Sequence, residues 1–295
     1  FQGQKRLRYK DQAADPSSCH SKKTVQMLFL QIRAVISIEE IPDFVSIESE
    51  LLVVQHECFA FNLQVVQTQG VDIIPPEVKL RGTDVDWDVN RTVEVAEVAR
   101  ETLARRGREQ FFLSTDANEL CPDAETVVKY LMKLREASPM AFEHLLYVEQ
   151  PTERDLSAHR FDMESVAAIK PVVADEGITD LRSLELAREL GWSGVALKTC
   201  KGHSEALLYV ALASESDLVY TVQDLTNPGL AFLHSAGLAA RTSPLMGVEH
   251  NARQYLPRAD QRVQEAHPTV FQVLDGCIST RALSEKGLGY HGTLR

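Results

Sequence analysis

The chain has 295 residues, 44% of them hydrophobic and 25% charged, which is the composition of an ordinary globular protein. Its formal net charge of −11 argues against a nucleic-acid-binding surface, because such a surface carries a basic stripe. No apolar run is long enough to span a bilayer, so no membrane partner is expected. The five cysteines form no CxxC pair, which argues against a disulfide framework or a zinc site and favours the reducing cytoplasm.

The first quarter of the chain gives few structural signals. Residues 1–23 are polar and basic and are expected to form a loop or an arm, whose first three residues resemble the remnant of a cleaved tag. Apolar runs between residues 24 and 67 resemble strands. One of them, Phe59 to Val66, is a candidate for the first strand of the domain that follows.

From Val71 onward, short β-type runs alternate with amphipathic helical stretches. The predicted strands cover residues 78–80, 111–113, 145–148, 172–174, 194–197, 218–222 and 245–248. The predicted helices cover residues 88–106, 123–137, 163–169, 181–190, 204–213 and 229–240. Alternation of this kind predicts a parallel sheet. Seven or more units favour a closed (β/α) barrel, with an open doubly wound sheet as the alternative.

Polar residues lie at or just after the end of each predicted strand, two of them at the first strand and one at each of the others. These residues are Lys79, Arg81, Asp116, Glu149, Asp175, Lys198, Asp224 and Glu249. From Asp116 onward they are about 23 to 33 residues apart, which is one strand–helix repeat per step. Catalytic side chains of barrel enzymes lie at the carboxyl ends of the strands. We therefore expect these residues to point into one shared site.

Three carboxylates, Asp116, Glu149 and Asp175, follow three consecutive strands, and Lys198 follows the next. Mg²⁺ prefers carboxylate oxygens, with water or substrate oxygens completing an octahedron. Any one of these acids is more simply explained by a local ion pair. Three in succession, with a lysine after them, indicate a Mg²⁺ site beside a base.

Five short motifs occur in order along the alternating region. They are Lys79-Leu80-Arg81-Gly82, Thr115-Asp116-Ala117-Asn118, Tyr147-Val148-Glu149-Gln150-Pro151, Ala174-Asp175-Glu176 and Leu197-Lys198. Through them the chain resembles the enolase superfamily, in its mandelate racemase and muconate lactonizing branch. The resemblance implies a modified TIM barrel preceded by an α+β capping domain. We therefore expect an arm and a reduced or incomplete cap over residues 1–58 and an enolase-like barrel over residues 59–295.

The resemblance also implies a role for each matched residue. Asp116, Glu149 and Asp175 would bind Mg²⁺. Lys198 would remove a proton α to a carboxylate and so form an enediolate. The residues expected to surround the metal ligands are Asn118, Glu176 and His250.

Arg81 stands where the family usually has the second lysine of a Lys-x-Lys pair. A guanidinium cannot readily give up its proton, so Arg81 is a better anion clamp than a base. It therefore favours β-elimination by one base over racemisation, which would need Lys79 or another group as a second base. The alternative for Arg81 is a structural ion pair with Asp84 or Asp88.

The proposed base itself needs an unusual environment. A lysine with an ordinary pKa near 10.4 is protonated at neutral pH and cannot accept a proton. We expect partial burial and a nearby cation to lower the pKa of Lys198 towards neutrality.

Three residues near the ends of the last two strands complete the expected site. Asp224 is expected to hydrogen-bond the substrate or the lysine, and Glu249 is expected to assist the leaving group. His250 is a candidate acid, although a lone histidine is more often structural. Lys201, in the turn after the strand that ends at Lys198, is expected to face solvent.

The expected function is that of a Mg²⁺-dependent lyase or isomerase acting on a small carboxylate, in the first place a hydroxy-acid or sugar-acid dehydratase. The alternatives are a racemase, epimerase or cycloisomerase of the same superfamily, a Schiff-base aldolase that uses Lys198, and a non-catalytic carboxylate-binding relative. A homo-oligomer is expected.

Overall fold

The computed structural model describes residues 45–47, 66–68, 77–105, 107, 111–223, 227–250, 252, 256, 258–272 and 278–283. Asp224, an expected site residue, lies outside these ranges, and so does most of the candidate strand from Phe59 to Val66. No helix in the described ranges is both long and apolar enough to cross a membrane.

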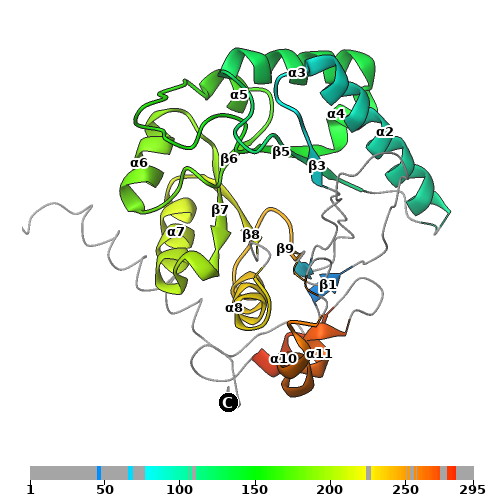
Figure 1. The fold of residues 1–295 in the computed structure, drawn as a ribbon, viewed down its shortest axis with the longest axis vertical. Helices are drawn as coiled ribbons and strands as arrows, with labels where there is room; N and C mark the ends of the chain where they lie inside the picture. Colours follow the sequence, from blue (N-terminus) through cyan, green and yellow to red (C-terminus); the bar gives the residue numbers. More distant parts are fainter. Residues whose placement is uncertain are drawn as a thin grey trace, which may run out of the picture.

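Seven parallel strands form one sheet, in which each strand pairs with the next one along the chain. They are β3 (Glu77–Lys79), β4 (Leu113–Asp116), β5 (Leu145–Glu149), β6 (Val172–Ala174), β7 (Gly194–Lys198), β8 (Val219–Gln223) and β9 (Val248–Glu249). A doubly wound sheet reverses its strand order at a switch point, and this order has none. The sheet curls in one direction, as a (β/α) barrel does, so the prediction of a barrel is confirmed (Figure 1).

The second and the last predicted strands of this series differ most from the observed ones. The prediction of a strand over residues 111–113 is displaced, because β4 begins at Leu113 and ends at Asp116. Phe111 instead lies buried ahead of the strand, with its ring stacked on His144 at a centroid distance of 4.2 Å. The predicted strand over residues 245–248 is reduced to Val248–Glu249.

Helices connect the strands and lie outside the curled sheet (Figure 1). They are α2 (Val85–Ala104), α3 (Ala124–Ala137), α4 (Pro139–His144), α5 (Glu164–Ala167), α6 (Leu181–Glu189), α7 (His203–Glu215), α8 (Leu230–Ala239), α10 (Gln261–Ala266) and α11 (Pro268–Phe271). Two 3₁₀ turns, η1 (Thr199–Lys201) and η2 (Arg281–Leu283), complete the helical elements of the described chain. Side-chain caps fix several helix starts: Asp84 accepts a hydrogen bond from Trp87 N–H, and Asp123 accepts one from Thr126 N–H.

A two-stranded antiparallel sheet precedes the barrel strands. It pairs β1 (Val45–Ile47) with β2 (Val66–Thr68). These strands lie on the two sides of the expected domain boundary at residue 58, which stays a prediction.

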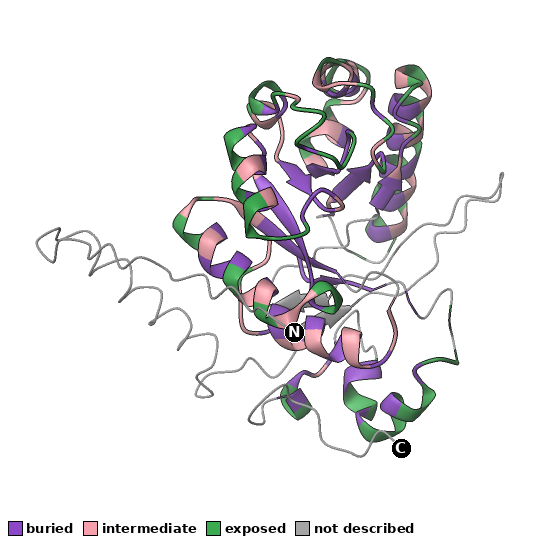
Figure 2. Cartoon of the chain, turned by 60° about the vertical axis from the view of Figure 1, so that its left-hand side comes forward, coloured by how far each residue is buried: buried purple, intermediate pink, exposed green. Residues whose placement is uncertain are grey.

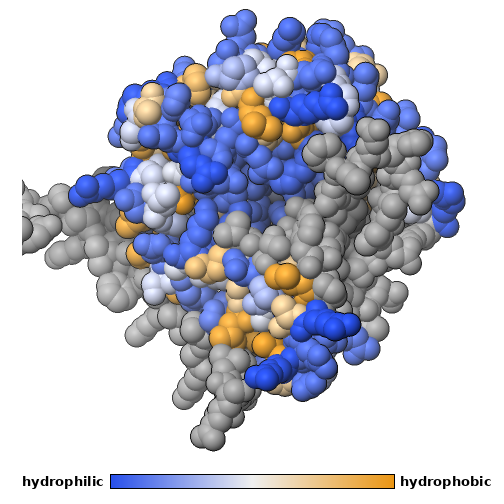
Figure 3. Space-filling view, in the orientation of Figure 1, coloured by the Kyte–Doolittle hydropathy of each residue, from blue (hydrophilic) through white to orange (hydrophobic). Residues whose placement is uncertain are grey.

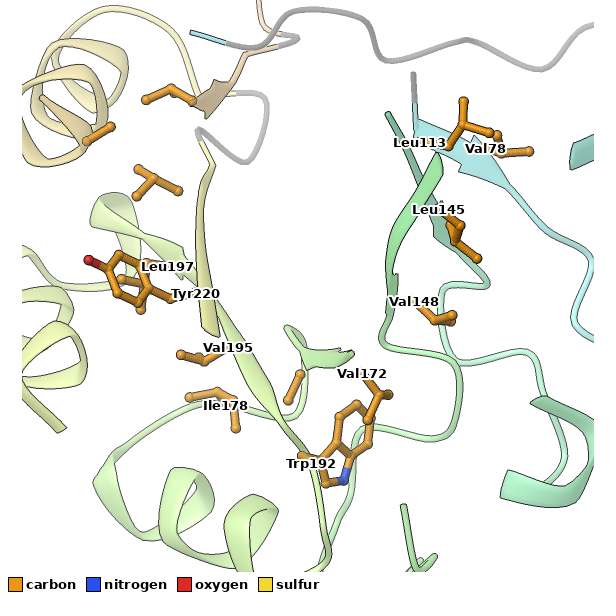
Figure 4. Close-up of a cluster of buried hydrophobic side chains, with 14 of the residues drawn as sticks. Val78, Leu113, Leu145, Val148, Val172, Ile178, Trp192, Val195, Leu197 and Tyr220 are labelled. Carbon is orange, nitrogen blue, oxygen red and sulfur yellow. The ribbon is translucent and has the colours of Figure 1, made fainter. Parts of the chain in front are cut away.

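Alternate side chains of the barrel strands face opposite sides of the sheet. One set is apolar and packs against the helices, and its members lie on the outer side of the curled sheet (Figure 4). It includes Val78, Leu113, Val148, Val172, Val195 and Leu197. The strands are buried, whereas exposed residues lie on the outer faces of the helices (Figure 2). The other set points inward and carries the polar residues of the site.

The turn between β3 and α2 depends on Gly82. The Asp88 carboxylate accepts hydrogen bonds from the backbone N–H groups of Arg81 (2.7 Å) and Gly82 (3.0 Å). Gly82 has a φ of +71°, and a Cβ there would lie 2.5 Å from the carbonyl carbon of Leu120. The loops after β3 and β4 therefore meet at a position where only glycine fits.

Gly82→Ala is expected to lower the free energy of unfolding by roughly 3 kcal/mol, because left-handed strain of about 1–3 kcal/mol is combined with a backbone clash. Urea denaturation would measure the loss. Gly107→Ala is the matched control: Gly107 has a φ of +74°, but a Cβ there would meet nothing within 4 Å. Equal losses in the two variants would contradict a role for the close approach of Gly82 to Leu120.

Candidate active site and metal centre

The carboxyl ends of the strands bring the predicted polar residues together on the inner side of the sheet. Lys79, Asp116 and Glu149 are successive partners across β3, β4 and β5 in the pairing register. Hydrophilic residues gather on the face that lies over the inner side of the curled sheet (Figure 3). The pairing register therefore brings these three predicted residues together at one end of the sheet.

Three buried carboxylates form a group on the β3–β5 side of the site. One oxygen from each of Glu77, Asp116 and Glu149 lies within 4.8 Å of the other two. Asp116 and Glu149 are predicted metal ligands, whereas Glu77 is not among the predicted site residues. Strand parity is the signal that identifies it, because Glu77 and Lys79 are two residues apart in β3 and face the same side.

Lys79 forms ion pairs with two of these three acids. Its Nζ donates to Glu77 Oε1 at 2.6 Å and also to Asp116 Oδ2. Burial alone would lower the pKa of Lys79, but the negative charges of Glu77 and Asp116 raise it well above its ordinary value. Lys79 is therefore protonated in this arrangement and is not poised to accept a proton.

Asp175, the third predicted metal ligand, lies outside the group of three acids. Its Oδ2 accepts a hydrogen bond from Lys198 Nζ, and its Oδ1 accepts one from Lys201 Nζ at 3.1 Å. Lys201 is exposed, as expected, but its ammonium also reaches Asp175, which the sequence does not predict. Lys198 and Lys201 are separated by one turn of the 3₁₀ helix η1, which places residues i and i+3 on the same side.

The acids of the site have opposite pKa shifts. Burial and the charge of Glu77 raise the pKa of Asp116 well above its ordinary value. Burial and the charges of Asp175 and Asp116 do the same to the pKa of Glu149. Burial alone would also raise the pKa of Asp175, but Lys198 and Lys201 outweigh it and hold that pKa below its ordinary value.

The side chains around Lys198 alone shift its pKa upward, opposite to the lowering that is expected with a bound cation. Burial alone would lower the pKa of Lys198, but the negative charges of Asp175 and Glu149 raise it above its ordinary value. The expectation assumed a cation beside Lys198, whereas the neighbouring protein groups are mainly carboxylates. The ammonium form of Lys198 is therefore favoured while these carboxylates are ionised.

Backbone and amide groups hold the acids in place. Asn118, as expected, contacts Asp116: its N–H donates to Oδ1 at 2.6 Å and its Nδ2 donates to Oδ2 at 2.9 Å. Gln150 is fully buried, and its Oε1 accepts hydrogen bonds from the N–H groups of Asp175 (2.7 Å) and Gly177 (3.1 Å). Gln150 thus links the loop after β5 to the loop after β6.

Gln223 extends the site across the barrel. It is the register partner of Lys198 on one side and of Glu249 on the other. Its Nε2 donates to Glu149 Oε2 at 2.7 Å, which joins β8 to β5. Glu249 lies close enough for its charge to raise the pKa of Lys198 and of Glu149.

Two predicted site residues point elsewhere. The Arg81 guanidinium lies 4.0 Å from the centroid of the Trp87 ring and 3.8 Å from Asp84, with half of its side chain exposed. This geometry matches the structural alternative for Arg81. His250 stacks on Phe232 of α8, with ring centroids 3.9 Å apart, so it lies on the helix side of the sheet.

Glu176 adds a further acid beside Asp175. Burial and the charge of Asp175 raise the pKa of Glu176. It is half-buried and follows Asp175 in the chain, as expected for a residue that surrounds the metal ligands.

The residues present fit a hard divalent cation such as Mg²⁺. Asp116 and Glu149 are 2% and 3% exposed, and buried carboxylates with raised pKa values are costly unless a cation neutralises them. The donors are all carboxylate oxygens, which Mg²⁺ prefers. Glu77, within the group, and Asp175, beside it, are the two candidates for a third ligand.

Comparison with known proteins identifies structural relatives only. None of the protein-family models and none of the curated proteins matches the sequence. The L-Ala-D/L-Glu epimerase from Bacillus subtilis matches with a TM-score of 0.52 at 21% identity, covering 69% of this chain and 52% of the epimerase. A mandelate racemase/muconate lactonizing protein from Herpetosiphon aurantiacus matches with a TM-score of 0.48 at 23% identity, covering 59% of this chain and 46% of that protein.

A muconate lactonizing enzyme from Klebsiella pneumoniae has a TM-score of 0.49 at 19% identity, and the match covers 69% of this chain and 52% of that enzyme. The chain thus spans about half the length of the structures that it matches. Together with the strand order, the similarity to the B. subtilis epimerase shows that the chain has an enolase-like (β/α) barrel fold.

Proposed function

We propose that the chain belongs to the enolase superfamily and is a Mg²⁺-dependent enzyme that removes a proton α to the carboxylate of a small substrate. The observation that carries this proposal is the arrangement of charges inside the barrel. A group of buried acids, Glu77, Asp116 and Glu149, lies on the β3–β5 side. A buried lysine, Lys198, projects from β7 and is bound to Asp175.

Asp116 and Glu149 hold the cation, with Glu77 or Asp175 as the third protein ligand. A bound Mg²⁺ would supply positive charge that stabilises the developing charge of the substrate carboxylate and offsets the acids that raise the pKa of Lys198. Lys198 accepts the α proton at its Nζ once that amine is neutral.

The position of Arg81 supports elimination over racemisation as the reaction. Arg81 contacts Trp87 and Asp84 and so does not supply a second acid–base group, which leaves Lys79 as the second lysine that a racemase would need. Lys198 is the proposed base, and one base suffices for β-elimination of water from a hydroxy acid or sugar acid. A racemase, epimerase or cycloisomerase is the second candidate, because the B. subtilis protein that matches with a TM-score of 0.52 is an epimerase.

A substrate screen in deuterium oxide tests the proposal. Hydroxy acids, sugar acids and dipeptides would be incubated with the protein and Mg²⁺, and Cα exchange and dehydration would be followed by NMR. We expect one class to exchange, EDTA to abolish the exchange, and added Mg²⁺ to restore it. Dehydration products would favour the lyase, whereas exchange with epimerisation would favour the isomerase. Exchange that persists in EDTA would contradict a metal-dependent reaction.

A further inference from the structure

Lys201 holds Asp175 at two points. Its Nζ donates to the backbone carbonyl oxygen of Asp175 at 3.0 Å and to carboxylate Oδ1 of the same residue at 3.1 Å. Lys198 occupies the other carboxylate oxygen, Oδ2. One aspartate is therefore shared by two ammonium groups, each on its own oxygen.

The local sequence explains how both lysines reach one acid. Lys198 ends β7, and Lys201 ends the 3₁₀ turn η1 that follows directly. A 3₁₀ helix has three residues per turn, so side chains at i and i+3 point the same way. Gly202 then closes the turn with a φ of +154°, where a Cβ would lie 2.8 Å from Glu205 Oε2.

The opposite side of Asp175 is fixed as well. The Gln150 side chain accepts the Asp175 N–H at 2.7 Å, so the backbone of Asp175 is bound at its N–H by Gln150 and at its carbonyl by Lys201. With Oδ1 also bound by Lys201, the carboxylate cannot turn without breaking that ion pair. Oδ2 is left directed at Lys198.

We propose that Lys201 is a positioning residue, which sets the orientation of the Asp175 carboxylate and through it the position of the Lys198 ammonium. The link to catalysis rests on the proposed function, whereas the positioning itself does not. A role in simple charge balance makes the opposite prediction for metal binding: removing a positive charge beside a cation site raises its affinity for cations, whereas releasing a ligand from its orienting partner lowers it.

The first test measures the reactivity of Lys198 in the full chain without metal. Lys198 is 7% exposed, and its acetylation by an amine-reactive reagent would be followed by peptide mass spectrometry. We expect Lys201→Met to raise the acetylation rate of Lys198 several-fold and Lys201→Arg to restore protection, because a guanidinium can also bind two oxygens. Lys129→Met, which removes one charge from the exposed face of α3, is the control and should change nothing.

The second test titrates the same variants with Mg²⁺ by isothermal calorimetry. We expect Lys201→Met to weaken Mg²⁺ binding by about 10- to 100-fold, the range for loss of a group that orients a metal ligand, and Lys201→Arg to recover most of it. Unchanged Lys198 acetylation in Lys201→Met, or tighter Mg²⁺ binding in that variant, would overturn the positioning role. Absence of Mg²⁺ binding in the unsubstituted protein would instead count against the proposed function, and the acetylation rates would still decide the role of Lys201.

Discussion

Lys198→Ala is expected to lower the rate of Cα proton exchange by about 10²- to 10⁴-fold, the usual contribution of a positioned acid–base group. Lys198 ends β7 on the inner side of the sheet, is buried, and is bound to Asp175. Because Lys79 projects from β3, four strands away from β7 in the sheet, it is poorly placed to remove the same proton as Lys198.

The measurement is deuterium incorporation into the substrate found by the screen, with Lys133→Ala as the control. Lys133 is an exposed lysine of α3 that pairs with Asp86, so its loss should leave exchange unchanged. Removing one partner of a buried ion pair also destabilises a protein, by about 3–5 kcal/mol. Lys198→Met, which retains most of the side-chain volume, and circular dichroism of both variants would separate misfolding from loss of the base.

Borohydride trapping with the same substrate discriminates between the proposed reaction and a Schiff-base aldolase. An aldolase would form an imine at Lys198 that borohydride reduces to a stable adduct. We expect no such adduct with the carboxylate substrate. An adduct at Lys198, or full exchange in Lys198→Ala, would contradict its assignment as the base.

The strands and their order could be predicted from the sequence because each is a short apolar run followed by a polar residue. The runs at residues 172–174 and 194–197, for example, coincide with β6 and β7 to within one residue. Strand order follows from the regular alternation, since consecutive parallel strands joined by helices lie side by side. The placement of Asp116 and Glu149 at one level follows in turn from the pairing of β4 with β5.

The site residues that could not be predicted from the sequence are those whose partners lie on other strands of the barrel. Glu77 is at the start of β3, and only its inward direction and the proximity of Asp116 and Glu149 make it part of the site. The sequence predicts Asp224 as the site residue after this strand. The register instead places Gln223 opposite Lys198, on the inner side of the sheet. The contact of Lys201 with Asp175 cannot be predicted, because the 3₁₀ turn η1 is too short to produce a periodic pattern in the sequence.

The effect of the protein's own groups on the pKa of Lys198 cannot be predicted from the sequence, for an electrostatic reason. Its direction depends on whether burial and cations or carboxylates dominate around the amine. That balance is set by neighbours from other strands, among them Asp175, Glu149 and Glu249. A field that sums contributions from distant parts of the chain has no local sequence signature.

Glu149→Gln is expected to have two opposite effects, a more stable protein without metal and a loss of response to Mg²⁺. Burial and neighbouring acids raise the pKa of Glu149, so its ionised form is costly in the folded chain. Glutamine has nearly the same volume and no charge, so it removes this cost, which is about 1.4 kcal/mol for each unit by which the folded pKa exceeds the unfolded one. Glutamine keeps a side-chain oxygen that accepts the hydrogen bond from Gln223.

The pH dependence gives this prediction its sign. The folded-state pKa of Glu149 lies above its unfolded value, which is about 4.3. Its favourable contribution to stability is therefore present below that unfolded value and is lost as the pH rises through the folded pKa. In EDTA, the advantage of Glu149→Gln over the unsubstituted protein should accordingly be larger at pH 8 than at pH 5.

Thermal and urea unfolding at both pH values, with EDTA or with Mg²⁺, would measure these effects. Mg²⁺ at 100 times its dissociation constant should stabilise the unsubstituted protein by about 2.7 kcal/mol and should leave Glu149→Gln almost unchanged. Glu153→Gln, in the exposed part of the same loop, is the matched control and should respond to Mg²⁺ as the unsubstituted protein does. If Glu149→Gln were less stable in EDTA yet still stabilised by Mg²⁺, Glu149 would be a structural acid and the cation would have to bind elsewhere in the barrel.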